Sequence, residues 1–250
     1  MESKKYISMK DMAKKLGVSI PTISRALKNS PEISDELCEK VKRLAKDMNY
    51  RPNPFAMSLR KNAPRTIGVI VPDIVTHFFS SIVKGIEEAA VANGYFVIIT
   101  TSSENSEHEK RNVENLVNMR VEGIIACLSQ DTTDYSHFLA LKDINMPVVL
   151  FDRTCMPDKF STVIADGAKS AQMATQHFID NGSHRIAFIG GPNHLDIVRR
   201  RKHGYLEALR ANKIPIEKEL VVCRKIDYQE GKIAAEQLLS LSNPPDAILA

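Results

Sequence analysis

Residues 19–25 hold the side chains with the clearest chemical use in this 250-residue chain. The segment combines hydroxyl groups and one guanidinium with small apolar groups. Such polar groups bind base edges in the major groove of DNA, and apolar side chains contact the methyl group of thymine. The sequence shows no Ser-His-Asp or Cys-His arrangement, no HExxH spacing and no GxxxxGK[ST] phosphate loop. The residues therefore favour recognition of DNA over catalysis.

Two short helices joined by a tight turn are expected to position this segment, because residues 8–29 carry the pattern of a helix-turn-helix. Ser8 is a suitable N-cap with Asp11 three residues later, and Gly17 supplies the left-handed corner between the helices. A plain amphipathic hairpin has the same apolar spacing, but the caps and the turn glycine together favour the DNA-reading unit. Ser19 caps the second helix, whose inner face is Ile23, Ala26 and Leu27 and whose outer face is Ile20, Pro21, Thr22, Ser24 and Arg25.

A third helix and a short linker helix follow this unit. Residues 50–61 predict a linker helix of about two turns, with Asn53 as its N-cap and Pro54 at its first position. An isolated helix of that length is marginal in water, so we expect it to fold only against a partner. The third helix opens at Ser34 and has apolar residues at helical spacing, namely Leu37, Val41, Leu44, Ala45 and Met48.

The basic charge of the chain is concentrated near its beginning. Residues 1–61 contain 14 Lys and Arg against 7 Asp and Glu, a formal charge of +7, and the remaining residues carry −3. Such a concentration is typical of a surface that lies against DNA phosphates. The sequence has no apolar run long enough to span a membrane and no signal-peptide apolar region, so we expect a cytoplasmic protein without a membrane partner.

The four cysteines and seven histidines indicate neither a metal site nor a cofactor. The histidines show no ligand spacing. Cys38, Cys127, Cys155 and Cys223 are widely spaced and form no CxxC pair. We interpret them as reduced thiols, mostly in the core, in preference to metal ligands or a disulfide.

Beyond residue 62 the pattern changes to short apolar runs that alternate with helical stretches. β-Branched runs separated by helices predict βαβ units around parallel sheets. Helices are expected over 78–93 and 168–181, each followed by a glycine. The extended connection from Asp152 to Val163 predicts a crossover between two sheets, and hence two lobes. The apolar runs are residues 66–73, 95–102, 122–129, 147–153, 185–192 and 219–225.

The order of residues in three places resembles the lactose/galactose repressor (LacI/GalR) family of bacterial transcriptional regulators. The matching patterns are GVS..T.SR.L at 17–27, YRPN..A..L at 50–59 and R..GY at 201–205. The resemblance implies a DNA-binding headpiece, a hinge helix and a core like that of periplasmic sugar-binding proteins. It also implies a homodimer that binds a pseudo-palindromic, double-stranded operator.

The resemblance assigns roles to individual residues of the headpiece and hinge. It implies that Arg25 reaches a base edge, and a guanidinium fork pairs with guanine O6 and N7. Ile20 and Pro21 occupy the two specificity positions. Leu59 is implied to partly unstack a base step from the minor groove, with a buried linker residue as the alternative. The expected DNA-binding residues are Ser19, Ile20, Pro21, Thr22, Ser24, Arg25, Asn29, Tyr50, Asn53, Ala56 and Leu59.

Candidate effector residues follow the predicted strands, because ligands of an open α/β sheet lie beyond the carboxyl ends of its strands. A carbohydrate needs a planar apolar surface and polar groups that bond neighbouring hydroxyls in pairs. Phe78 or Phe79 suits the first role, with a core position as the alternative. Asp152 and Arg201 suit the second, with a salt bridge as the alternative. The expected effector residues are Asp73, Phe78, Phe79, Asp152 and Arg201.

The sequence and its resemblance predict a small all-α helix-turn-helix headpiece (1–49), a hinge helix or linker (50–61) and an α/β periplasmic-binding-protein-like core. The core is expected to have two Rossmann-like parallel-sheet lobes (62–162 and 163–250), the second incomplete because residues 243–250 read as the entry to a further strand. The expected function is a repressor controlled by a small-molecule effector, a sugar or sugar derivative, in a cleft between the lobes. Two alternatives stay open: a constitutive DNA-binding dimer with a non-sensing core, and a sugar-handling enzyme with a fused DNA-binding head.

Overall fold

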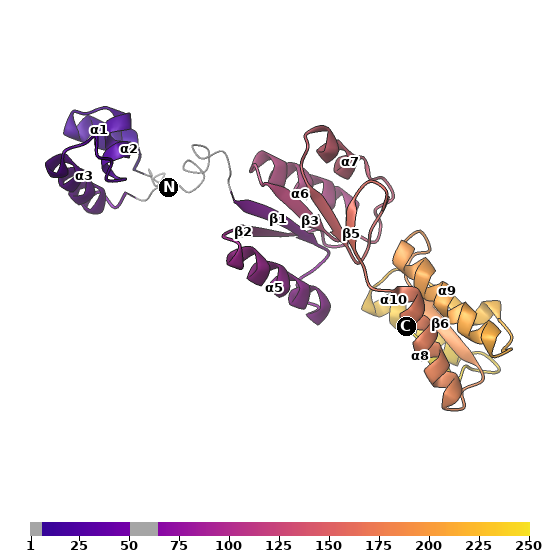
Figure 1. Cartoon of the computed structure of the whole chain (residues 1–250). Helices are drawn as coiled ribbons and strands as arrows, with labels where there is room; N and C mark the ends of the chain where they lie inside the picture. The colour runs from indigo at the N-terminus through magenta and orange to yellow at the C-terminus, as the bar shows by residue number, and fades with distance from the viewer. Residues whose placement is uncertain (1–6, 51–64) are drawn as a thin grey trace. The chain divides into compact units, whose positions relative to one another are not determined.

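The computed structural model describes residues 7–50 and 65–250. The chain divides into two compact units, Met1–Ala63 and Pro64–Ala250 (Figure 1). Among the described residues, the first unit contains helices and no strands and the second is α/β, and each has its own buried core.

Three helices form the headpiece: α1 (Met9–Leu16), α2 (Ile20–Ala26) and α3 (Asp35–Asp47). Each helix begins after a serine, Ser8, Ser19 or Ser34, whose hydroxyl accepts a backbone N–H of the first turn. A serine cap satisfies a donor that the helix leaves unpaired and stabilises the helix by about 1 kcal/mol. Gly17 ends α1 with a φ of 66°. The predicted caps and the glycine corner are confirmed.

The headpiece core takes one fully buried side chain from each helix. Met12, Ile23 and Val41 are all 0% exposed. Half-buried apolar residues surround them, including Leu16 of α1 and Leu44 of α3. Burial of this apolar surface therefore holds α2 against α1 and α3.

The first lobe of the second unit is a five-stranded parallel sheet in the order β2-β1-β3-β4-β5. Helix α5 (His77–Ala92) lies on one face, and α6 (Ser106–Asn118) and α7 (Ser136–Asp143) lie on the other (Figure 1). Parallel strands covered on both faces are apolar on both, which explains the continuous apolar runs in the sequence. The strands are β1 (Thr66–Val71), β2 (Phe96–Thr101), β3 (Gly123–Ala126), β4 (Val148–Phe151) and β5 (Ser161–Val163).

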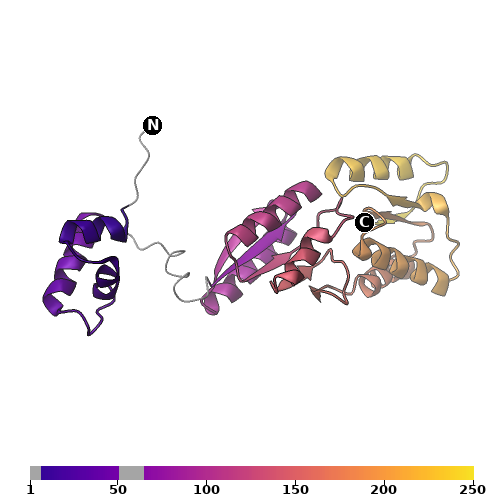
Figure 2. The ribbon, with the colours of Figure 1, turned by 90° about the horizontal axis from the view of Figure 1, so that it is seen from above.

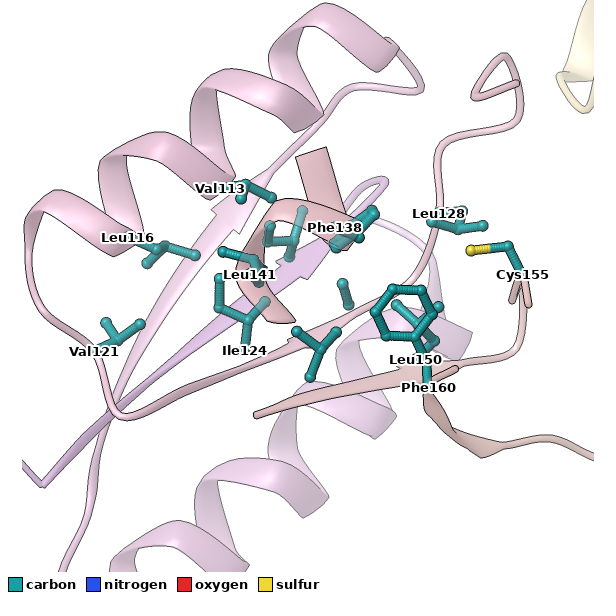
Figure 3. Packing of buried hydrophobic residues seen from close by; sticks show 13 residues of the cluster. Val113, Leu116, Val121, Ile124, Leu128, Phe138, Leu141, Leu150, Cys155 and Phe160 are labelled. Carbon is teal, nitrogen blue, oxygen red and sulfur yellow. The ribbon is translucent and has the colours of Figure 1, made fainter. Parts of the chain in front are cut away.

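The core between this sheet and its two covering helices is shown in Figure 3. Leu116 of α6 and Phe138 of α7 are fully buried and lie over Ile124 of β3 and Leu150 of β4. These side chains fix the sheet and the loops that leave its carboxyl edge.

Strand β5 corrects the prediction of an extended crossover from Asp152 to Val163. Residues 161–163 pair with β4, with Phe151 opposite Val163. Three residues, two of them polar, are too few to show a strand period in the sequence, and the strand exists because β4 offers an unpaired edge. The predicted boundary between residues 162 and 163 falls inside β5, and the division of the core into two domains there stays a prediction.

The second lobe is a three-stranded parallel sheet in the order β7-β6-β8. Helices α8 (Gly167–Asp180) and α9 (Asp196–Ala211) lie on one face and α10 (Tyr228–Leu239) on the other (Figure 2). The strand expected near residue 250 is present as β8. The remaining elements are β6 (Ile186–Gly190), the short 3₁₀ helix η1 (Lys218–Leu220), β7 (Val221–Cys223) and β8 (Ala247–Leu249).

Helices α8 and α9 approach each other most closely at Gly204. A Cβ at this position would lie 1.9 Å from the carbonyl oxygen of Ala168, so only glycine fits. The next residue, Tyr205, is fully buried, and its hydroxyl donates to the carbonyl of Ile186 at 2.8 Å. Burial raises the pKa of Tyr205 to about 12. The Gly-Tyr pair thus joins α9 to both α8 and the sheet.

We predict that Gly204→Ala destabilises the core strongly, by about 1–3 kcal/mol or more, because the new methyl group meets backbone that does not yield. Gly231→Ala in α10 is the matched control, since a Cβ there meets nothing within 4 Å. The control is expected to keep or raise stability, by up to about 1 kcal/mol. Urea unfolding of both variants measures the difference, and equal stability would contradict the close packing.

Candidate functional site

The N-terminal part of α2 is exposed to solvent. Ser19, Ile20, Pro21 and Arg25 are exposed, and Thr22 is half-buried with its hydroxyl 2.8 Å from that of Ser19. Pro21 costs no hydrogen bond, because it lies in the first turn. We call these five residues, Ser19, Ile20, Pro21, Thr22 and Arg25, the reading face.

Ser24 is only 7% exposed, which corrects its predicted outward position. It lies next to Ile23 and three residues before Leu27, so it lies beside the apolar inner face. Its role in DNA binding stays a prediction.

Arg25 forms an ion pair with Glu32, which follows α2 in the turn to α3. The distance from Arg25 Nε to Glu32 Oε2 is 3.3 Å, and both side chains are more than half exposed. Two other predicted DNA-binding residues lie outside α2. Asn29 is exposed in a left-handed turn with a φ of 52°, whereas Tyr50 is half-buried and packs on the headpiece core. The predicted hinge residues Asn53, Ala56 and Leu59 lie outside the described residues.

The carboxyl ends of β1 and β4 carry the predicted effector residues of the first lobe. Asp73 follows β1, and its Oδ1 accepts the backbone N–H groups of Val75 and Thr76, each at 2.8 Å. Phe78 is 50% exposed at the start of α5. Phe79 is only 5% exposed and packs in the core under α5, which is the alternative position that the sequence allowed for it.

Asp152 follows β4 in a left-handed conformation with a φ of 56°. Burial raises the pKa of its carboxyl, and the positive charges of Arg153 and Arg201 act in the opposite direction. Arg201 of the second lobe is therefore within electrostatic range of Asp152. The Arg201 side chain is exposed on α9, and its Cγ lies 3.4 Å from the position that a Cβ of Gly167 would take.

An ion pair between Arg153 and Glu104 lies at the same carboxyl edge of the first sheet, and no pattern in the sequence predicted it. Arg153 is 6% exposed, and its Nη1 donates to both carboxylate oxygens of Glu104 at 2.8 and 2.7 Å. Glu104 also accepts the backbone N–H of Gln130. The Gln130 amide in turn bonds both backbone groups of Ile226, at 2.6 and 3.4 Å. This chain of contacts, from Arg153 through Glu104 and Gln130 to Ile226, joins the first lobe to the second.

A fully buried carboxylate, Glu109 of α6, holds the loop that leaves β3. It is 0% exposed and accepts from the backbone N–H of Ser129, the hydroxyl of Thr132 and a ring nitrogen of His137. The loop that follows β3 is thus fixed in place by hydrogen bonds to a single charged group.

Tyr228 is a further candidate effector residue that was not predicted from the sequence. The rule that ligands lie beyond the carboxyl ends of parallel strands also applies to it. It is the first residue of α10, in the connection beyond the carboxyl end of β7, and is 82% exposed. An exposed aromatic ring beyond a strand end is the planar surface that a sugar needs.

The described residues contain neither a metal cluster nor a membrane helix. In residues 7–50 and 65–250, no set of three or more His, Cys, Asp or Glu side chains is placed to hold a metal ion, and no helix is long and apolar enough to cross a membrane. Three of the four cysteines, Cys38, Cys127 and Cys155, are buried, so their predicted core positions are confirmed.

Comparison with known proteins shows which protein family each of the two units matches. Residues 8–53 match the bacterial regulatory proteins of the lacI family, and residues 64–250 match the periplasmic binding proteins and sugar binding domain of the LacI family. The chain belongs to the LacI family. The predicted fold class is confirmed, and because this family consists of DNA-binding transcriptional regulators, the fused-enzyme alternative is dropped.

Relatives span the whole described chain. The transcriptional repressor CytR of Escherichia coli is 32% identical over 96% of this chain and 70% of its own length. A structure of the lac repressor dimer bound to operator and the anti-inducer ONPF is 25% identical, with a TM-score of 0.74, over 98% of this chain and 73% of its own. A complex of the regulator CelR with cellobiose is 27% identical, with a TM-score of 0.66, over 97% and 73% of the two chains.

We predict that Asp152→Asn raises stability at neutral and higher pH. Burial raises the pKa of Asp152 in the folded chain above its unfolded value, so the wild type loses stability as pH rises from the unfolded pKa to the folded pKa. Asparagine removes the ionisation and tolerates the left-handed backbone. The melting temperature of the variant should exceed that of the wild type at about pH 8, and the difference should shrink towards about pH 4.

The control is Asp158→Asn, which changes an exposed carboxylate in the same loop. A variant at Asp152 that melts at or below the wild-type temperature at high pH would show that the two arginines outweigh burial.

Proposed function

We propose that this LacI-family protein is a repressor that binds a pseudo-palindromic operator as a homodimer and responds to a sugar or sugar derivative. The observation that carries the DNA-binding part is the exposed reading face on a serine-capped helix, held by a separate buried core. Related proteins with this headpiece are named transcriptional repressors, and one is a dimer bound to operator.

The reading face suits the major groove. Arg25 presents a planar fork for guanine, and Ile20 and Pro21 offer apolar contact to thymine methyl groups. Ser19 and the N-terminus of α2 suit a phosphate, which sets register without reading sequence. Asn29 and Tyr50 are proposed as further DNA contacts of the headpiece, and Asn53, Ala56 and Leu59 are proposed to reach the minor groove from the hinge.

Arg25→Ala should lower discrimination at one base pair of each half-site by about five- to 150-fold, the equivalent of 1–3 kcal/mol for a bidentate pair. Competition binding against operators that carry each of the four base pairs at each position measures this loss. Arg43→Ala, which removes an exposed arginine from α3, is the control and should leave base preference unchanged. An Arg25 variant that folds normally and keeps every base preference would remove Arg25 from the reading face.

The effector is proposed to bind beyond the carboxyl ends of the strands in both lobes. Phe78 and Tyr228 offer exposed aromatic rings, and Asp152 and Arg201 offer opposite charges within electrostatic range. Such groups bond adjacent hydroxyls of a sugar while a ring covers its apolar face. Asp73 contributes a carboxylate already held at the start of α5. Among the similar structures, CelR is a complex with cellobiose and Cra a complex with fructose 1-phosphate.

A panel of sugars and sugar phosphates should contain a compound that raises the melting temperature and changes operator affinity together. Ligand at 100 times its Kd stabilises the folded chain by about 2.7 kcal/mol. Asp152→Asn should lose this response while remaining folded. A wild-type chain that binds its operator and is indifferent to every compound would favour the constitutive alternative.

The homodimer is proposed to form over an open apolar groove of about 510 Å³ between α5 and the first sheet. Ile82, Gly85, Ile86 and Ile125 are among its lining residues, and the effector candidates are not. The edge strand β2 adds exposed apolar surface through Phe96, which is 71% exposed. A second copy of this chain is the proposed occupant, because a two-fold operator needs two headpieces.

Gly85→Glu should dissociate the dimer without unfolding the protomer. A Cβ at Gly85 meets nothing within 4 Å, and glutamate is a better helix former than glycine by about 0.5–1 kcal/mol, but its charge would be buried under a partner. Gly231→Glu in α10 has the same open space and is the control. Sedimentation measures the mass, and a Gly85 variant as dimeric as the wild type would contradict this interface.

A further inference from the structure

We propose that Glu32 is a positioning residue that orients Arg25 and thereby sets base selectivity at the base pair that Arg25 reads. The inference rests on the proposed function, because it takes Arg25 as the residue that reads a base.

The geometry of the ion pair leaves the reading end of Arg25 open. Glu32 Oε2 lies 3.3 Å from Nε, the guanidinium nitrogen closest to the main chain. Among the described residues, Arg25 has no other ion pair. The two terminal nitrogens remain for guanine O6 and N7, which a guanidinium binds in pairs. A carboxylate beside Nε therefore favours one orientation of the fork without occupying the nitrogens that bind the base.

The turn after α2 holds Glu32 in this place. Asn29 adopts a left-handed conformation with a φ of 52°, and the backbone N–H of Ser30 returns to the carbonyl of Arg25 at 3.1 Å. Pro31 then restricts the chain directly before Glu32. The backbone N–H of Ile33 bonds to Ser30 at 3.0 Å, and its side chain packs on the headpiece core. The backbone around the carboxylate is thus ordered by the fold before DNA binds.

The negative charge of Glu32 argues against a role in raising affinity for DNA in general. A carboxylate next to the reading face is repelled by phosphates, so it weakens binding to every duplex. The orientation that Glu32 gives to Arg25 favours binding only when the base offers a pair of acceptors to Arg25. On a mismatched base Arg25 lacks these acceptors, and the repulsion between Glu32 and the phosphates remains. This combination of one attractive and one repulsive element produces selectivity rather than affinity. Glu36 and Glu39, two further exposed acidic residues of the headpiece, form ion pairs with lysines of their own helix α3.

The test uses the full chain as wild type, Glu32→Gln, Arg25→Ala and the double variant, with Glu36→Gln as the matched control that removes the same charge. The dissociation constants are measured for the operator, for its three base variants at the position defined by Arg25→Ala, and for a random duplex. Melting temperatures confirm that every variant is folded.

Glu32→Gln is expected to lower the base preference at that position by about two- to fivefold, which is the range of an exposed ion pair. It should also raise affinity for the random duplex. In the Arg25→Ala background it should have no effect on base preference, and Glu36→Gln should leave base preference unchanged.

Three results would overturn the positioning role: an unchanged preference in Glu32→Gln, an effect that persists without Arg25, or an equal effect of Glu36→Gln. The second would show that Glu32 contacts a base directly. If Arg25→Ala itself changes no base preference, the proposed reading role fails and the positioning role fails with it. These results therefore separate failure of the proposed function from failure of the inference.

Discussion

Two carboxylates, the half-buried Glu104 and the fully buried Glu109, make the hydrogen bonds on which the carboxyl edge of the first sheet depends. Glu104 neutralises Arg153 and also holds the backbone of Gln130, while Glu109 ties down the loop after β3. Removing one partner of such a buried pair costs about 3–5 kcal/mol, because the other charge is left unpaired. The apolar core makes the first sheet, and these two acids hold the loops at its carboxyl edge.

The candidate effector site combines this rigid support with locally unfavourable features. Asp152 is left-handed and partly desolvated, and the aromatic rings of Phe78 and Tyr228 are exposed. Unfavourable groups that persist in a well-packed surrounding are typical of functional positions. Because Gln130 connects the lobes through Ile226, a ligand bound at the strand ends has a route to their relative arrangement. Control of DNA binding then requires that the ligand bind two lobe arrangements with different affinity.

Local features of both units were predictable, and pairings between distant residues were not. Serine caps, the Gly17 corner and the apolar strands are each encoded within a few residues, and they are confirmed. Ser24 was misplaced because neighbouring helix positions differ by about 100° in direction, and polarity alone does not fix the boundary of the buried face. The Arg153 and Glu104 pair joins residues 49 positions apart, and no single-sequence pattern announces such a contact. The ion pair between Glu32 and Arg25 was not predicted, because it depends on the turn after α2 that brings the two side chains together.

The central claim is that this chain reads a specific DNA site and that a small molecule changes how it does so. The most direct measurement is selection of preferred duplexes from a random pool by the 250-residue chain, followed by binding of the enriched duplexes with and without the panel of sugars and sugar phosphates. The account predicts one enriched pseudo-palindrome whose affinity changes with one compound. Failure to enrich any site would contradict it.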